Sequence, residues 1–174
     1  DVYKRQLWSY ATGNEVGSSP TVVNGVVYVG SDQIYALDAS TGTLLWSYST
    51  GQIEFSPAVA RGVLYVGGGS GKVYALNAST GALLWINATH GVSSPAVANG
   101  IVYVGGIRDV YAMSASTGAK LWYYHTYGEV ESSPAVANGV VYVGSYDGNV
   151  YALNAKSGAK LWSYKTAGYG GVVS

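Results

Sequence analysis

One sequence pattern occurs four times in this chain of 174 residues, at a nearly constant spacing. In each copy an apolar run leads into a turn and then into Ala-x-x-Ala-x-x-Gly-x-x-x-Trp. The copies end at Trp46, Trp85, Trp122 and Trp162, and a further tryptophan, Trp8, lies one period upstream. Successive tryptophans are 38, 39, 37 and 40 residues apart. A period near forty residues indicates one supersecondary unit repeated along the chain, and this constrains the fold more than any other feature.

Each copy of the repeat predicts four short β-strands. In the last copy we expect them at 133–137, 140–144, 150–153 and 160–164. The first two strands flank Asn138-Gly139, which favours a type I′ hairpin turn because both central residues need positive φ. We predict a second turn of the same kind at Tyr146–Asn149 and a third at Asn154–Gly158. Gly, Pro or Asn-Gly interrupts the chain every six to ten residues, which excludes a helix of useful length.

The other copies follow this plan with small departures. Asn24-Gly25 and Asn99-Gly100 keep the first turn, whereas Arg61-Gly62 is a weaker version in which Arg61 is mildly strained by positive φ. In the third copy Ser114 stands where the others have Asp or Asn, so its third turn lacks the usual capping side chain. We therefore expect a slightly looser third copy.

Four antiparallel strands per forty residues match one blade of a β-propeller, so the predicted fold is all-β. We expect four complete blades at about 17–50, 55–87, 92–124 and 131–164, within a repeat region covering 7–174. Residues 1–6 fit no copy of the repeat. They form an off-pattern segment that we interpret as a sequencing or assembly scar and exclude from fold reasoning.

The repeat resembles the pyrroloquinoline quinone (PQQ) repeat, also called the tryptophan-docking motif. The resemblance rests on Ser-Pro-Ala-Val, Gly-x-Val-Tyr-Val-Gly and Ala-x-Asp/Asn-Ala-x-Thr/Ser-Gly-x-x-x-Trp, and it extends from Leu7 to about Gly168. It implies that the tryptophans pack against neighbouring blades while the glycines let the turns fit beneath them. The structural docking residues are then Trp8, Trp46, Trp85, Trp122 and Trp162, with Gly42, Gly81, Gly118 and Gly158.

The chain is out of phase with its repeats. Leu7–Tyr10 match the fourth strand of a blade whose first three strands are missing, and 167–174 match the approach to a new first strand. Propellers of this type usually need seven or eight blades, so partial blades at both ends leave three explanations. The chain belongs to a longer protein, two chains form an eight-bladed ring, or open blade edges join subunits into a filament.

Composition excludes several functions. Nine basic and nine acidic residues give zero net charge, and no basic patch is available for nucleic acid. The sequence has no cysteine, which excludes a disulfide, a zinc–thiolate site and a thiol nucleophile. No apolar stretch is long enough for a membrane span. The partners that remain are proteins, other copies of this chain and glycans.

Enzymatic activity is not predicted. The resemblance extends to quinone dehydrogenases, in which it implies a catalytic Asp, calcium ligands from Glu and Asn, an adjacent Cys pair and long inserts. This chain has neither the cysteines nor the inserts. We therefore expect no catalytic residues, no metal site and no cofactor.

Candidate binding residues lie in the loops that join successive blades. These loops should gather on one face of a propeller, where side chains from several copies converge; they carry His90, His125, Glu54, Glu129 and Glu131. Tyr10, Tyr48, Tyr124 and Tyr164 end the outer strands and are candidates for an aromatic rim that binds a glycan or a subunit. Asn77 and Asn87 match the glycosylation acceptor pattern, although Asn77 also has a turn-capping explanation.

These observations predict a non-enzymatic PQQ-like propeller that acts as a binding or scaffold module. By its resemblance to cell-envelope propellers, we expect it outside the cytoplasm, in the periplasm or beyond the cell. The first alternative is a self-assembling structural subunit, either a two-chain ring or an extracellular filament. The second alternative is a fragment of a PQQ-dependent dehydrogenase.

Overall fold

The computed structural model describes residues 6–90 and 93–166, which form sixteen β-strands and no helix. The all-β prediction is confirmed. Blade 1 contains β1 (Thr21–Val23), β2 (Val26–Gly30), β3 (Ile34–Asp38) and β4 (Leu44–Tyr48). Blade 2 contains β5 (Ala58–Ala60), β6 (Val63–Gly68), β7 (Lys72–Asn77) and β8 (Leu83–Ala88). Blade 3 contains β9 (Ala96–Ala98), β10 (Ile101–Gly105), β11 (Asp109–Ser114) and β12 (Lys120–His125). Blade 4 contains β13 (Ala135–Ala137), β14 (Val140–Gly144), β15 (Asn149–Asn154) and β16 (Lys160–Lys165).

Every blade is one four-stranded antiparallel sheet with its strands in chain order. The third and fourth strands carry the same irregularity in every copy. In blade 4 the pairing runs from Ala152 opposite Trp162 to Leu153 opposite Lys160, so Leu161 is an extra residue in a β-bulge. Equivalent shifts follow Ala36, Ala75 and Ala112. The bulge leaves one leucine per blade half exposed on the outer strand, namely Leu45, Leu84, Leu121 and Leu161.

The first turn of each blade has the backbone geometry that Asn-Gly predicts. Asn138 and Gly139 have φ values of 50° and 76°, and Arg61 adopts the same left-handed conformation with φ 51°. The second turn of blade 4 differs from our prediction of a second type I′ turn. There only Gly148 has positive φ, and its N–H donates to the carbonyl of Ser145 at 3.0 Å. The Asp147 carboxylate accepts the N–H of Asn149 and fixes this different turn.

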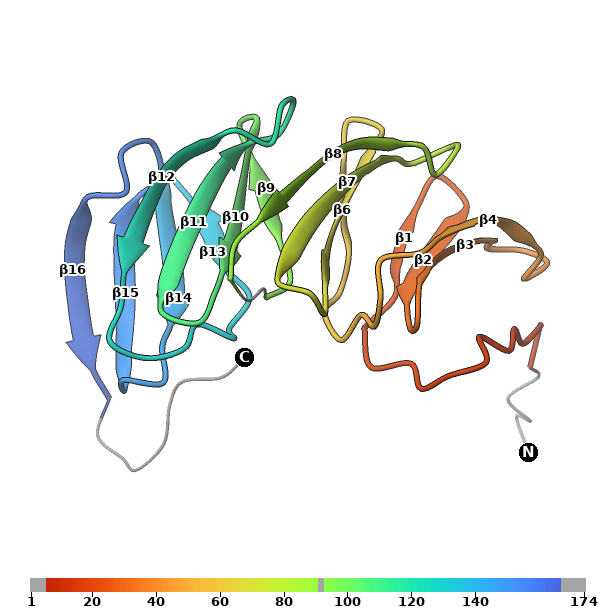
Figure 1. The fold of residues 1–174 in the computed structure, drawn as a ribbon, viewed down its shortest axis with the longest axis horizontal. Coiled ribbons are helices and arrows are strands. Elements are labelled where there is room, and N and C mark those ends of the chain that lie inside the picture. The colour runs from red at the N-terminus through yellow and green to blue at the C-terminus, as the bar shows by residue number, and fades with distance from the viewer. Residues whose placement is uncertain (1–5, 91–92, 167–174) are drawn as a thin grey trace.

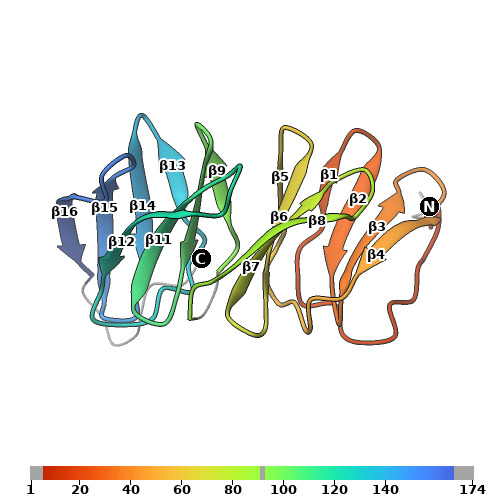
Figure 2. The same ribbon diagram turned by 45° about the horizontal axis from the view of Figure 1, so that its top comes forward.

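The four blades stand side by side in chain order along an arc (Figure 1). Their first strands form the inner edge, where β1 contacts β5, β5 contacts β9 and β9 contacts β13. The fourth strands form the outer edge. Blades 1 and 4 lie at opposite ends of the arc in both views (Figures 1 and 2).

The hydrophobic core lies between blades rather than within one blade. Three buried clusters fill the three junctions, and each combines side chains from the facing sheets of two consecutive blades. At the junction of blades 3 and 4, Tyr103, Val110 and Trp122 of blade 3 pack against Val141 and Leu153 of blade 4. Each blade is therefore stabilised by burial against its neighbour.

A fourth cluster lies at the outer face of blade 1. Trp8 and Tyr10 pack there against the buried side chains of Val29, Tyr35 and Leu37. We expected Leu7–Tyr10 to correspond to a fourth strand, but the segment is not a strand in the structure. No strand lies beside this segment in the described residues, so it has no partner for a β-ladder. Trp8 and Tyr10 nevertheless pack against blade 1 as the tryptophan and tyrosine of a fourth strand would. None of the described elements is a helix long and apolar enough to cross a bilayer.

Candidate functional site

The junction contact is the most regular feature of the molecule. The indole Nε1–H of Trp46 donates to the carbonyl of Ala78 in the next blade at 3.0 Å. Three further tryptophans make the same contact with the following blade, in the pairs Trp8–Ala39, Trp85–Ala115 and Trp122–Ala155. A tyrosine of the second strand joins the same carbonyl in three cases, in the pairs Tyr28–Ala78, Tyr65–Ala115 and Tyr103–Ala155.

A glycine lies beneath each of these indole rings. A Cβ atom on Gly118 would come within 2.6 Å of the Trp85 ring, and Gly118 has a left-handed φ of 72°. Gly42, Gly81 and Gly158 stand in the same relation to Trp8, Trp46 and Trp122. Only glycine satisfies both conditions, because any other L residue would be strained and would also collide with the ring.

The last tryptophan makes no such contact in the described part of the chain. Trp162 is 47% exposed, whereas Trp122 is 9% exposed. Its ring lies beside Tyr142, with 6.0 Å between ring centroids, as in the other blades. The outer face of blade 4 therefore presents an indole and a phenol arranged as at the three filled junctions.

The loops between blades and the second turns lie at one end of the blades. An antiparallel four-stranded sheet places the turn between its second and third strands at the same end as the loop that leaves its fourth strand. Backbone hydrogen bonds connect the two sets: Gly69 N–H donates to the Gln52 carbonyl at 2.7 Å, and Tyr146 N–H donates to the Glu129 carbonyl at 2.8 Å. This end, which we call the loop face, is thus held by main-chain contacts.

Two adjoining hollows open on the loop face. The first has a volume of about 370 Å³ and spans the loops and turns of blades 2 to 4. The second, of about 580 Å³, is lined by loop residues that lie just before the first strands of the blades. Both are lined by Glu54, Phe55 and Glu131, so they form one groove, which we call the loop-face groove. Three of the predicted candidates, Glu54, Glu129 and Glu131, line it.

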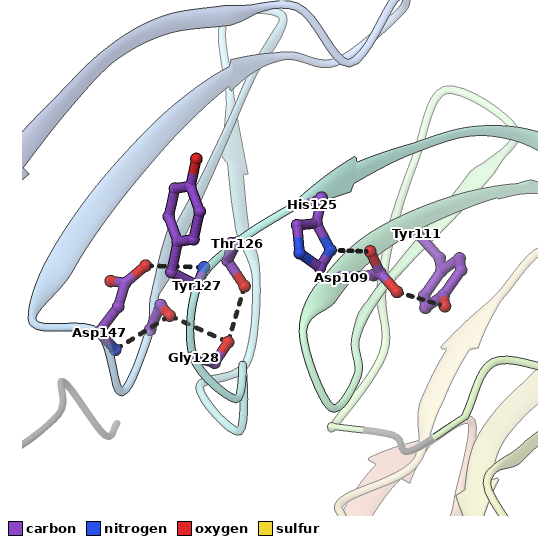
Figure 3. A network of polar contacts seen from close by, with 8 residues as sticks. Asp109, Tyr111, His125, Thr126, Tyr127, Gly128 and Asp147 are labelled. Atoms are coloured by element: carbon purple, nitrogen blue, oxygen red, sulfur yellow. Dashed lines mark hydrogen bonds and ion pairs between the residues drawn. The ribbon is translucent and has the colours of Figure 1, made fainter.

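The two histidines lie elsewhere. His90 is exposed, has a φ of 51° and does not line either hollow. His125 ends β12, and its Nδ1 lies 3.0 Å from Oδ1 of Asp109 (Figure 3). The hydroxyl of Tyr111 donates to the other oxygen of that carboxylate at 2.8 Å. The structure therefore places His125 in a polar cluster apart from the acidic residues of the groove.

A second polar cluster joins blades 3 and 4. Asp147 accepts a hydrogen bond from the Tyr127 N–H at 3.0 Å (Figure 3). It also accepts one from the Tyr151 hydroxyl at 2.6 Å. Partial burial raises the pKa of Asp147, but these bonds and those from Asn149 outweigh it, so the pKa lies below its ordinary value. Burial and the neighbouring Asp147 carboxylate raise the pKa of Tyr151. Asp147 thus orders a turn at the edge of the loop face.

The remaining candidates have structural contacts. The Asn77 side-chain oxygen accepts the N–H groups of Ser79 and Thr80, both at 3.0 Å, which is the turn cap anticipated from the sequence. The Asn87 side-chain amide donates to the Gly118 carbonyl of the next blade at 2.6 Å. Tyr10, Tyr48 and Tyr124 pack against tyrosines of the following blade, whereas Tyr164 is exposed.

Sequence reasoning missed most other residues of the groove, among them Gln52, Phe55 and Ile107. One signal was available. Every copy of the repeat contains a Ser-Pro step. The residue before this step is Ser18, Ser93 or Ser132 in three copies, and it is Phe55 in the second copy alone. A departure of this kind inside a regular repeat marks a position for inspection.

The described residues do not fit a quinone cofactor with its metal. No group of three or more His, Cys, Asp or Glu side chains in ranges 6–90 and 93–166 is placed to hold a metal ion. The sequence also lacks the adjacent cysteine pair that the resemblance to quinone dehydrogenases implies. We therefore derive no chemistry through such a group.

Four-stranded blades that stand around an inner edge and interlock through a repeated Trp–Gly contact define a β-propeller of the PQQ-like type. A family model described as outer membrane protein assembly factor BamB matches residues 3–91 and again residues 86–173. The chain belongs to this family, and the predicted PQQ-like resemblance is confirmed.

Solved structures share the fold. The crystal structure of BamB from Moraxella catarrhalis has a TM-score of 0.81 at 21% identity, over 93% of this chain and 56% of that one. A quinohemoprotein alcohol dehydrogenase from Pseudomonas putida HK5 has a TM-score of 0.76 at 24% identity, over 88% of this chain and 34% of that one. A europium-containing methanol dehydrogenase has a TM-score of 0.81 at 19% identity, over 95% of this chain and 44% of that one.

The chain thus spans about half the length of the Moraxella protein and a third to under half of the two dehydrogenases. At these identities the likeness concerns the fold alone. A comparison with curated protein sequences finds no match.

Proposed function

We propose that this chain forms part of a non-catalytic binding or scaffold module in the cell envelope, on the periplasmic side of an outer membrane. The observation that carries the proposal is the loop-face groove, which residues of all four blades line and which main-chain hydrogen bonds support. Membership of a family described as an outer membrane protein assembly factor supports both the location and a protein partner. The work of the module is to hold a partner against a rigid face.

Site-specific photo-crosslinking in a host with an outer membrane tests this proposal. A photoreactive amino acid at Ile107, which is 53% exposed in the groove, should give one or a few defined protein adducts. The matched control is the same amino acid at Lys156, an exposed residue in a third turn at the opposite end of blade 4. Absence of adducts at Ile107, or an identical set at both positions, would contradict the proposal.

Self-assembly is a second candidate function, and the open outer face of blade 4 favours it. Trp162 and Tyr142 are arranged as at the filled junctions, yet in the described residues no blade covers them. A second copy could bring a blade to this face. Light scattering after size-exclusion chromatography should then give a mass near 36 kDa, twice 18.1 kDa, or much larger particles. A monomer at all concentrations would remove this candidate.

A further inference from the structure

We propose that the loop-face groove binds an extended peptide segment that presents a lysine or arginine next to an apolar side chain. This inference rests on the proposed binding function and adds the site and the chemistry of the partner. Its basis is the combination of three carboxylates with two apolar side chains, one of which, Phe55, departs from the pattern of the repeat.

The groove carries charge of one sign. Glu54 and Glu131 line both of its hollows, and Glu129 lines the first. Among the described residues that line either hollow there is no lysine or arginine. The Tyr146 hydroxyl donates to Glu131 Oε2 at 3.0 Å and holds that carboxylate in place. A cationic side chain complements this lining, whereas phosphate groups would be repelled.

The groove also has an apolar part. Phe55 lines both hollows on one side, and on the other side it packs against the buried cluster between blades 2 and 3. Ile107 extends the apolar surface towards blade 3 and is largely exposed. A free cation or a polyamine would leave these two side chains uncovered, so the partner must carry an apolar group as well.

The repeat itself provides an internal comparison for Phe55. In blades 1, 3 and 4 the equivalent residue is a buried serine that accepts a hydrogen bond from the N–H of a second-strand glycine. The pairs are Ser18–Gly30 at 2.7 Å, Ser93–Gly105 at 2.8 Å and Ser132–Gly144 at 2.7 Å. Blade 2 replaces this contact with an aromatic ring that lines both hollows of the groove. The fold works with serine here, so the architecture alone does not explain Phe55.

Hydroxyl groups continue the groove along the inner strands. Ser19, Ser56, Ser94 and Ser133 line the second hollow, one from each blade. Two of them join consecutive blades, because Ser19 N–H donates to Ser56 Oγ and Ser56 N–H donates to Ser94 Oγ, each at 3.0 Å. A row of polar groups crossing four blades suits an extended main chain, which can exchange hydrogen bonds along its length.

A random heptapeptide library displayed on phage and selected on the immobilised chain tests the inference. We expect the selected peptides to be enriched in lysine or arginine beside an apolar residue. A selected peptide is then synthesised with a fluorophore, and its affinity is measured by anisotropy against the wild type and three variants. Glu54→Gln combined with Glu131→Gln should weaken binding at least tenfold, and Phe55→Ser should do so separately.

The matched control is Glu15→Gln, an exposed acid in the same class of loop that lines neither hollow. It should bind like the wild type, and urea unfolding shows whether each variant is folded. Phe55→Ser restores the serine of the other blades, so its loss of binding would not reflect a loss of fold.

Selected peptides without the basic–apolar pair, or binding that all variants retain, would overturn the groove assignment while leaving a binding module intact. Failure to select any peptide on the folded chain would overturn the inference as well, and photo-crosslinking at Ile107 would then decide the proposed function independently.

Discussion

At each blade junction the side chain of one residue depends on the absence of a side chain in another. The indole of Trp85 lies on Gly118, and its N–H is satisfied by the Ala115 carbonyl of the same turn. Burial of a large ring and pairing of its polar atom both require the turn to pass close beneath it. Gly and Trp lie four residues apart within each copy. The contact joins the Trp of one copy to the Gly of the next, in agreement with the inter-blade packing that the resemblance implies.

Replacing Gly118 with alanine should destabilise the chain by about 2–4 kcal/mol, because positive φ and overpacking against Trp85 both contribute. Gly139→Ala is the matched variant. Gly139 has a similar φ of 76°, but a Cβ there would meet nothing within 4 Å, so we expect a loss of about 1 kcal/mol. Urea unfolding monitored by tryptophan fluorescence measures both. Equal losses would mean that the ring contact contributes nothing.

Asp38 should make stability depend on pH in a narrow window. Hydrogen bonds from the Ser40 hydroxyl, the Thr41 N–H and hydroxyl, and the Ser40 N–H lower its pKa from 3.8 to about 2. A depressed folded-state pKa stabilises the fold above the unfolded value, and this contribution is lost as the pH falls from about 4 to about 2.

Asn77 and Asn154 occupy the same position in other blades without a titratable group. Asp38→Asn should therefore keep the turn and remove the dependence. Unfolding free energies measured in urea between pH 2 and pH 7 should converge for the wild type and the variant as the pH falls towards 2. Parallel curves throughout this range would refute the assignment.

At the scale of elements, the third turns differ by one side chain. Asp38, Asn77 and Asn154 each accept two backbone N–H groups within the turn. In blade 3 the hydroxyl of Ser114 contacts only the hydroxyl of Ser116 among the described side-chain hydrogen bonds. The third turn of blade 3 therefore lacks the side-chain cap, as predicted from the sequence. That blade 3 is looser than the others remains a prediction.

Ser114→Asn should supply this cap and stabilise the chain by about 0.5–1.5 kcal/mol, the net value of one or two ordinary hydrogen bonds. The reverse exchange, Asn77→Ser, should cost a similar amount, because it removes the cap from blade 2. Urea midpoints of the two variants should move in opposite directions. A shift in the same direction for both would show that the cap does not govern turn stability.

The strands and first turns followed from alternation and from Asn-Gly, but the bulges did not. A bulge adds one residue to one strand, and the sequence shows this only as a Leu-Leu-Trp or Lys-Leu-Trp run in which the period of two is broken. Leu161 is turned outward for this reason. The second turn of blade 4 was mispredicted because the Asp147 carboxylate fixes it. This carboxylate accepts the Asn149 N–H within the turn and the Tyr127 N–H from a neighbouring loop, and the dipeptide Asp-Gly reveals neither contact.

At the scale of the whole molecule, two tryptophans with the same sequence context have different surroundings. Trp122→Ala should destabilise the chain by about 3–5 kcal/mol, because it empties a filled junction between blades 3 and 4. Trp162→Ala should cost less than about 1 kcal/mol in a monomer, since half of the ring is already in water. Unfolding in urea at low protein concentration compares them. Similar losses would show that Trp162 is covered in solution, as the self-assembly candidate requires.

The architecture could be predicted from the repeat, whereas the groove could not. Glu54, Ile107 and Glu129 lie in different copies, and their meeting depends on how each blade is rotated relative to the next. That rotation is set by side-chain packing between two consecutive blades, so it cannot be predicted from the sequence of a single copy. His125 shows a further limit, because its predicted loop position suggested a shared binding face with Glu54, Glu129 and Glu131, whereas the structure pairs it with Asp109.

The inner edge has a consequence for how the chain responds to stress. Contacts between sheets pass from β1 to β5, from β5 to β9 and from β9 to β13, so the blades form a linear series of coupled units. In such a series a middle blade must break two interfaces to open, while an end blade breaks one. Within the described residues, blades 2 and 3, which hold Phe55 and Ile107, each have a neighbouring blade on both sides, so local opening should be least frequent there.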